Sequence, residues 1–363
     1  MSKARLLFGS TFLALAVLLS SSAVAQPTAH VLPKVAKPAV NSPVTLTDSG
    51  DSWTLDNGIV KMTILKRNGN LSSLVYHGIE VLTRGQYWEQ VPSGTITAKV
   101  TIDPATNGGE RAEVSVKGVY TGDNTPTPGG AARPGGPGGP GGAARPGGPG
   151  GPGGAARPGG PGGPGGAAGP GGAPGAARPV AAGAPRGSVG LDIETRFTLE
   201  RGTSGFYTYA EYTHKASYPA AGEGESRFIL ESMNPTFNWL SVDKDRNQLM
   251  TSDADLRKGV VIHAKEQRIL ESGVYANSVE HKYSYNALMY KLQAWGWSST
   301  KDKIGVYFVN PSNEYIGGGP EKLDLIDHMS GTLLDYWTSG HYGGGAGNHI
   351  PAGEDWKHVV GPI

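Results

Sequence analysis

The fold is decided by a stretch in which two β-type runs flank a tight turn, WTLDNGIVKMTIL at residues 53–65. Apolar and polar residues alternate through 59–65, which is the period of a half-buried strand. Asp56-Asn57-Gly58 supplies the residue types that a two-stranded hairpin turn requires. The stretch therefore predicts two antiparallel strands, at 53–55 and 59–65.

The same pattern of short strands and turn residues recurs along the chain on both sides of a low-complexity block. Many short strands with turns between them favour an all-β fold over an α/β fold. We expect a large β-sandwich, with one short helix in 323–334. The further predicted strands are 71–76, 95–102, 111–120, 189–200, 205–214, 225–230, 259–264, 278–286, 292–297 and 304–310.

The N-terminal segment has the three parts of a secretory signal peptide. Lys3 and Arg5 precede a mostly apolar run at 6–19, and small residues follow at 22–25. The apolar run is too short to favour a membrane span. We expect residues 1–25 to be removed and 26–43 to be a linker, so the mature protein is predicted to be secreted or periplasmic and not membrane-bound.

A low-complexity block occupies residues 123–187. The unit ARPGGPGGPGGA recurs three times and spaces Arg133, Arg145 and Arg157 evenly. Each possible frame of glycine at every third residue is interrupted by arginine or alanine, which a collagen helix does not tolerate. We interpret the block as a flexible, solvated insertion in a surface hairpin loop.

Composition limits the classes of function. The chain has no cysteine, so an exported protein of this sequence must rely on its core rather than on disulfides. Its 32 basic and 31 acidic residues give a net charge of +1, and the basic residues form no stripe. Nucleic-acid binding is therefore not expected.

Three residues are candidates for chemistry. The alternation in SVEHKYSYN, residues 278–286, predicts a strand with Tyr283 on one face and Lys282 on the other. A lysine flanked by aromatic rings loses hydration, which favours the neutral amine and hence a base. His341 leaves an aromatic run for a glycine-rich loop, at a rim where it can meet a ligand. Arg227 can hold a carboxylate with its planar fork.

Each candidate also has an ordinary structural interpretation. Lys282 can be an exposed strand lysine, His341 a hydrogen-bonded loop histidine, and Arg227 half of a surface ion pair. Other types of site are not favoured. The histidines at 341, 349 and 358 lack zinc-ligand spacing, Ser339 is not in a nucleophile elbow, and residues 317–320 do not continue as a phosphate loop. We therefore expect no metal and no cofactor.

Six segments carry a resemblance to a known family. They resemble the N-terminal catalytic domain of the family 4 polysaccharide lyases, the rhamnogalacturonan endolyases, from about Val44 onward. The resemblance implies a large β-sandwich related to galactose mutarotase. It also implies cleavage of the rhamnose-(1→4)-galacturonate bond of pectic rhamnogalacturonan I by β-elimination, by a protein we expect to be monomeric. The segments are LDNGIVKMTI, LDIETRFTLERGTSGFYTYAEYTH, VEHKYSYN, NPSNEYIGGGPEKLDL, YWTSGHY and EDWKHVVGP.

The resemblance assigns roles to four residues. Lys282 corresponds to the family's essential lysine and is expected to remove the C5 proton of galacturonate. His341 would protonate or hold the leaving oxygen, or the two roles would be exchanged. Arg227 and Tyr336 are expected to bind the substrate, and Arg227 is expected to contact the carboxylate of the galacturonate. Leu334 stands where fungal members have a second tyrosine, so contacts with the sugar are expected to differ.

Two alternatives stay open at this point. A sandwich that binds sugar without turnover would keep the fold, and a mutarotase-like epimerase would need a His–Glu pair in place of Lys and His. Family members usually continue into a fibronectin-like domain and a carbohydrate-binding domain. The sequence ends at Ile363 without either, so we expect it to be a fragment.

Overall fold

The computed structural model describes residues 40–363 except 89–90, 123–189, 224, 233–235, 263, 319–320, 330, 340 and 342–347. The chain divides after Lys37, and all described residues belong to the unit Pro38–Ile363. The predicted signal peptide at 1–25, most of the predicted linker and the insertion at 123–187 lie outside the described residues.

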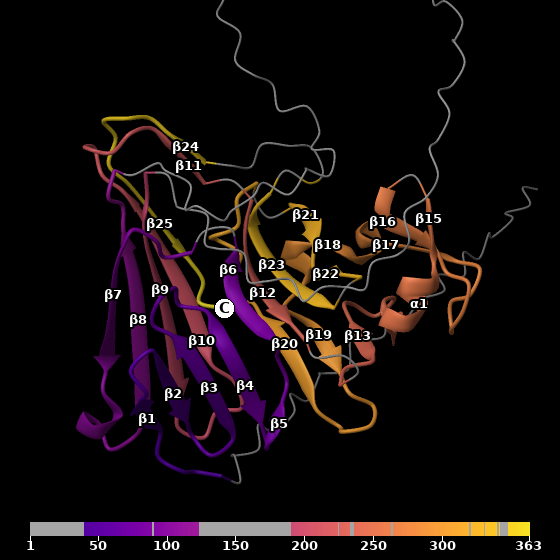
Figure 1. Ribbon diagram of the computed structural model, residues 1–363, viewed down its shortest axis with the longest axis horizontal. Coiled ribbons are helices and arrows are strands. Elements are labelled where there is room, and N and C mark those ends of the chain that lie inside the picture. The colour runs from indigo at the N-terminus through magenta and orange to yellow at the C-terminus, as the bar shows by residue number, and fades with distance from the viewer. Residues whose placement is uncertain are drawn as a thin grey trace, which may run out of the picture. The chain divides into compact units, whose positions relative to one another are not determined.

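The larger of the two main sheets has nine strands among these residues. Their order is β1-β2-β3-β4-β6-β12-β23-β22, with β5 paired to β4 (Figure 1). Neighbouring strands are antiparallel. The strands are β1 (Thr45–Asp48), β2 (Ser52–Asp56), β3 (Val60–Leu65), β4 (Leu71–Tyr76), β5 (Ile79–Glu80), β6 (Arg84–Trp88), β12 (Ser226–Glu231), β22 (Asp327–His328) and β23 (Thr332–Thr338).

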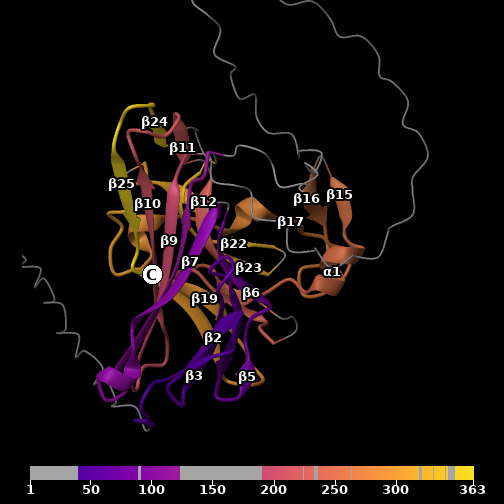
Figure 2. The same cartoon turned by 60° about the vertical axis from the view of Figure 1, so that its left-hand side comes forward.

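The second main sheet has five antiparallel strands in the order β25-β10-β9-β8-β7. Figure 2 shows β25, β10 and β9 running alongside one another in this sheet. Its strands are β7 (Thr95–Ile102), β8 (Arg111–Val119), β9 (Asp192–Glu200), β10 (Tyr207–His214) and β25 (Trp356–Val360).

Four smaller sheets and a few helical turns complete the described chain. The sheets are β11 (Ala221–Glu223) with β24 (Asn348–Ile350); β14 (Asn247–Leu249), β13 (Trp239–Ser241), β19 (Ala294–Ser298) and β20 (Gly305–Val309); β15 (Val260–Ile262), β16 (Ala264–Ile269) and β17 (Val279–His281); and β18 (Asn286–Leu288) with β21 (Leu323–Leu325). The helices are α1 (Asp253–Lys258) and three 3-10 turns, η1 (Pro104–Thr106), η2 (Lys282–Tyr285) and η3 (Met289–Lys291).

The two main sheets pack face to face through aromatic side chains. The ring of Phe197 in β9 lies 6.5 Å from that of Phe228 in β12. Tyr212 in β10 lies 6.2 Å from Trp337 in β23, and both are buried. Such aromatic contacts between the inner faces of two antiparallel sheets define a β-sandwich. The predicted all-β sandwich is confirmed.

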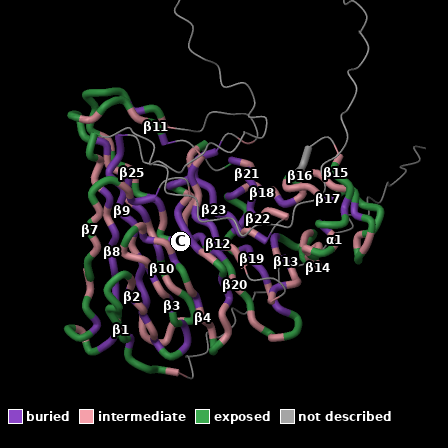
Figure 3. Tube along the Cα trace, in the orientation of Figure 1, coloured by how far each residue is buried: buried purple, intermediate pink, exposed green. Residues whose placement is uncertain are grey.

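The hairpin of residues 53–65 forms for the reasons given by its sequence. Val60, Met62 and Ile64 are buried while Lys61 is exposed, so β3 presents one face to the core (Figure 3). The side-chain Oδ1 of Asn57 accepts hydrogen bonds from two backbone N–H groups beyond the turn, at 3.0 and 2.8 Å. These contacts fix the turn and with it the register of β2 and β3.

Two local predictions are wrong. Residues 323–334 form β21, β22 and the start of β23 instead of a helix, because Leu333 faces the main core and Leu334 faces a second core on the opposite side of the sheet. Lys282 does not lie in a strand; it begins η2 directly after β17. The helix α1 was not predicted.

The outer face of the larger sheet, turned away from the second sheet, carries this second core. It consists of Ile229, Leu325, Leu334 and Tyr336, with Trp88 packed against it. Because residues alternate along β12, Phe228 points to the main core while Arg227 points to the outer face. The strands thus present Arg227 and Tyr336 on one side of the sheet, where the candidate site lies.

Candidate active site

Arg227 lies between two aromatic rings on the outer face of the larger sheet. The strand register pairs it with Trp88 of β6 on one side and with Tyr336 of β23 on the other. Its guanidinium carbon is 5.5 Å from the Trp88 ring centroid and 4.8 Å from that of Tyr336. The two predicted substrate-binding residues are therefore neighbours, and the aromatic faces hold the guanidinium in place.

Three groups converge on one carboxylate oxygen, Oε1 of Glu225. Nη1 of Arg227 lies 2.5 Å from it and the Tyr336 hydroxyl donates to it at 2.7 Å, while Nε2 of His341 is 3.9 Å away. Burial raises the pKa of Glu225, but Arg227, Tyr336 and His341 together outweigh burial and hold that pKa below its usual value. We call Arg227, Tyr336 and His341 the carboxylate cradle.

His341 is held from its other ring nitrogen by a buried acid. Its Nδ1 lies 3.3 Å from Oδ1 of Asp324, and Asp324 is fully buried. The imidazole packs edge-on against two rings, Tyr336 at 5.5 Å and Tyr283 at 6.2 Å. One nitrogen therefore faces the buried carboxylate of Asp324, while the other is turned toward the carboxylate of Glu225.

Lys282 is positioned by the end of β17. The His281 side chain accepts a hydrogen bond from the Tyr283 backbone, which turns the chain out of the strand into η2. The Lys282 Nζ atom lies 2.8 Å from Oε2 of Glu266 and 5.2 Å from the Tyr283 ring centroid. Beside the aromatic ring that the sequence led us to expect, the environment of Lys282 thus includes a carboxylate that the sequence did not reveal.

The Tyr283 ring and His328 connect Lys282 to the carboxylate cradle. Tyr283 contacts both Lys282 and His341. Nε2 of His328 is 3.7 Å from Oε1 of Glu266. Burial lowers the pKa of His328; Glu266 opposes this, and the positive charges of Lys282 and Arg227 lower the pKa further. The structure therefore brings all four sequence-predicted residues, Lys282, His341, Arg227 and Tyr336, into one cluster.

Four members of this cluster were missed by sequence reasoning: Glu225, Glu266, Asp324 and His328. Glu225 alone had a local signal, because it stands two residues before Arg227 and side chains two apart in an extended chain share a face. The other three come from separate strands and have no spacing that marks them. Only the fold places them together.

The cluster is a partly open face. The side chains of Lys282, His341 and Arg227 are 17%, 16% and 15% exposed. Two cavities lie elsewhere, one of about 360 Å³ beside Tyr207 and Tyr209 and one of about 230 Å³ beside Leu249. Neither is lined by Lys282, His341, Arg227 or Tyr336.

Within the described part of the chain, no group of three or more His, Asp or Glu residues is arranged to hold a metal ion. Nor does any helix in that part have the length and apolarity needed to cross a membrane.

Comparison with known proteins gives one family match. Residues 179–274 match the rhamnogalacturonate lyase family. This region contains Glu225, Arg227 and Glu266 and ends before Lys282. The match covers part of the chain and supports a lyase acting on a pectin-type polysaccharide.

No curated protein matched the chain. Among solved structures, a galactose mutarotase-like protein from Lactobacillus casei ATCC 334 is similar over 85% of this chain and 98% of that chain, with 8% sequence identity and a TM-score of 0.38.

Proposed function

We propose that this chain is a rhamnogalacturonan lyase that cleaves the rhamnose-(1→4)-galacturonate bond of rhamnogalacturonan I by β-elimination. The observation that carries the proposal is the convergence of Arg227, Tyr336 and His341 on one carboxylate oxygen, with Lys282 in the same cluster. A cation, a hydroxyl donor and an imidazole around a carboxylate are what a uronate substrate requires.

The carboxylate cradle would recognise galacturonate. The substrate carboxylate is attached to C5, the carbon that loses its proton, so negative charge spreads onto it as that proton leaves. A guanidinium and a hydroxyl aimed at this group stabilise the developing charge more than they stabilise the ground state. In the free protein, Glu225 occupies the position that a substrate carboxylate would take.

Lys282 and His341 would carry the protons. The Lys282 amine takes the C5 proton, the C5–H electron pair becomes the C4–C5 double bond, and the C4–O bond breaks. His341 gives a proton to the departing rhamnose-side oxygen. A lysine base must first lose its own proton, and Oε2 of Glu266 is within hydrogen-bond reach at 2.8 Å.

The remaining features fit a protein that acts on an extracellular polymer. The signal-peptide pattern at residues 1–25 supports export, and a near-neutral net charge gives no indication of another polyanion as partner. The steps above use side chains alone, without a cofactor. We propose a pectic polysaccharide as the partner and a monomer as the working form.

The deciding experiment is direct. Purified protein is mixed with rhamnogalacturonan I, and formation of the ultraviolet-absorbing unsaturated uronate is followed. We expect steady formation by the wild type and its loss in Lys282→Ala, which should still bind the polysaccharide. Binding without absorbance in the wild type would instead support a non-catalytic sugar-binding sandwich, and interconversion of sugar anomers would support an epimerase.

A further inference from the structure

Asp324 is a buried carboxylate whose two oxygens face different groups. The Ser339 hydroxyl donates to Oδ2 at 2.6 Å, and Nζ of Lys322 lies 2.8 Å from the same oxygen. Oδ1 accepts from the Leu325 backbone at 2.8 Å and lies 3.3 Å from Nδ1 of His341. The carboxylate is therefore held in one orientation, with Oδ1 toward the imidazole.

We propose that Asp324 is the positioning residue of His341: it keeps the proton on Nδ1 and leaves Nε2 to exchange protons with the sugar. An ionised carboxylate only accepts hydrogen bonds, so the nitrogen that faces it must be the one that bears hydrogen. The inference rests on the proposed function for its catalytic meaning, but the tautomer it assigns belongs to the free protein.

The charges around Asp324 support its ionised form. Burial raises the pKa of this carboxyl, but the contacts with His341, Lys322 and Ser339 outweigh burial and hold the pKa below its usual value. Lys322 is itself buried, with 7% of its side chain exposed, so solvent screens this pair weakly.

The other groups described around the His341 ring place Nε2 on the side of Glu225. Tyr336 of β23 and Tyr283 of η2 contact the ring edge-on, and Glu225 before β12 lies 3.9 Å from Nε2. With Nδ1 committed to Asp324, Nε2 points toward the carboxylate position of the cradle. This is the nitrogen that a departing sugar oxygen would meet.

The fold couples the positions of His341 and Lys282. Asp324 pairs with Ala287 of β18 in a two-stranded sheet. β18 begins at Asn286, directly after η2, and η2 begins with Lys282. One strand pair thus carries the group that orients the imidazole and anchors the turn that presents the amine.

Asp324→Asn tests the proposal sharply. The Ser339 hydroxyl donates to Oδ2 and the Lys322 ammonium is ion-paired with the same oxygen, whereas among these groups only the Leu325 backbone donates to Oδ1. The amide oxygen should therefore take the Oδ2 place, and the NH₂ group should face His341. Nδ1 would then accept a hydrogen bond, and the proton would move to Nε2. The readout is ¹⁵N NMR of histidine-labelled full chain without substrate, with the His341 signal assigned by its loss in His341→Gln.

We expect neutral His341 to be the Nδ1–H tautomer in the wild type and Nε2–H in Asp324→Asn. The variant should also lose about 100- to 10,000-fold in kcat on rhamnogalacturonan I with little change in KM. His341 acts as the acid in its imidazolium form, with hydrogen on both nitrogens, and an amide N–H in place of the Asp324 carboxylate opposes a proton on Nδ1. Asp327→Asn is the matched control, since Asp327 is also buried but accepts from Trp297 at 2.9 Å. The His341 tautomer should be unchanged in it.

The outcomes separate the two proposals. An Nε2–H tautomer in the wild type, which needs no variant to fold, overturns the role of Asp324. An unchanged tautomer in a folded Asp324→Asn protein does the same. The expected tautomers in a wild type that releases no unsaturated uronate would leave the positioning role supported and refute the lyase.

Discussion

Glu266 stands opposite Lys282 at the end of a strand pair, and its Oε2 lies 2.8 Å from the lysine Nζ. The register explains the contact, because Gln267 pairs with His281 and the next residues outward are Glu266 and Lys282. The proposed base is therefore already paired with a carboxylate in the free protein. Whether Lys282 acts as a base or as a fixed positive charge becomes an experimental question.

Lys282→Arg separates these two roles. Arginine keeps the positive charge and can reach Glu266, but its guanidinium does not give up its proton. We expect the variant to fold and bind rhamnogalacturonan I like the wild type. It should lose about 100- to 10,000-fold in kcat, the usual contribution of a positioned base. Initial rates of ultraviolet absorbance and calorimetric binding measure the two effects.

Lys282→Ala is the companion to that variant, since it removes both charge and base. If Lys282→Arg kept most of the wild-type rate while Lys282→Ala did not, the lysine would be acting as a charge. His341 would then be the better candidate for the base.

Glu225 should compete with the substrate for the carboxylate cradle. Glu225→Gln removes the negative charge beside Arg227 while keeping a similar shape, so a uronate no longer has to displace an ion pair. In a Lys282→Ala background, which prevents turnover, we expect galacturonate-containing oligosaccharides to bind about tenfold tighter, or ~1.4 kcal/mol. Isothermal titration calorimetry measures the change.

Arg227→Gln is the matched control for that prediction, because it removes the opposite charge from the same pair. It should weaken binding of the same oligosaccharides. Weaker binding in both variants would mean that Glu225 serves to position Arg227 and Tyr336, and that no substrate carboxylate replaces it.

The parts of the fold that were predictable are those determined locally. Gly58 has a φ of +81°, a conformation that glycine adopts without strain, and the Asn57 side chain caps the same turn. Strands β4 and β7 coincide with the predicted segments 71–76 and 95–102 for the same reason, since alternation is a property of neighbouring residues.

The parts that were missed depend on distant contacts. The alternation of Lys282 to Tyr285 is the same in a strand and in a 3-10 turn, and it is the His281 cap that selects the turn. Asp324 reaches His341 through its pairing with Ser339, which directly follows β23 and lies two residues before His341. No spacing in the sequence encodes that pairing, so the acid that orients the imidazole was invisible before the fold was known.

Asp335 should make stability fall as the pH rises toward neutrality. Burial raises its folded-state pKa from 3.8 to about 7. Between these values the unfolded chain releases the proton and the folded chain keeps it, so the contribution to stability present below about pH 4 is lost through about pH 7. In Asp335→Asn this dependence is absent. As the pH rises from about 4 to about 7, the unfolding free energy of the variant should therefore increase relative to that of the wild type by up to about 1.4 kcal/mol per pH unit.

Urea unfolding at about pH 5 and about pH 6 measures this difference. Asp245→Asn is the control, since that side chain is 75% exposed. The difference in unfolding free energy between this variant and the wild type should not change with pH. An equal pH dependence in the wild type and Asp335→Asn would show that another group is responsible.

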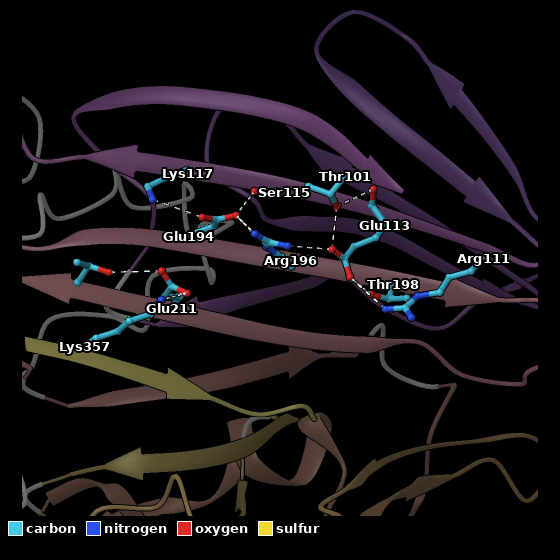
Figure 4. A network of polar contacts seen from close by, with 11 residues as sticks. Thr101, Arg111, Glu113, Ser115, Lys117, Glu194, Arg196, Thr198, Glu211 and Lys357 are labelled. Atoms are coloured by element: carbon cyan, nitrogen blue, oxygen red, sulfur yellow. Dashed lines mark hydrogen bonds and ion pairs between the residues drawn. The ribbon is translucent and has the colours of Figure 1, made fainter. Parts of the chain in front are cut away.

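Among the charged side chains on the outer face of the five-stranded sheet, Arg196 should contribute most to the stability of the fold. It links two buried carboxylates, Glu113 at 3.1 Å and Glu194 at 2.8 Å, within the network drawn in Figure 4. Burial raises the pKa of each carboxyl, but hydrogen bonds and the Arg196 charge outweigh burial and lower both values. Arg196→Met would leave two buried charges with fewer partners, and we expect it to cost about 1–3 kcal/mol at neutral pH.

Arg111→Met is the matched control for Arg196→Met, because Arg111 reaches Glu113 at 3.4 Å with a side chain that is 46% exposed. It should cost less than about 1 kcal/mol. Carboxylates with lowered pKa stabilise the fold above their unfolded-state pKa of 4.5 and lose that contribution in acid. The cost of Arg196→Met, measured by urea unfolding, should therefore shrink as the pH falls below about 4. A cost that stays constant with pH would mean that Arg196 acts by packing on the Tyr209 ring, 5.7 Å away, and that its charge contributes little.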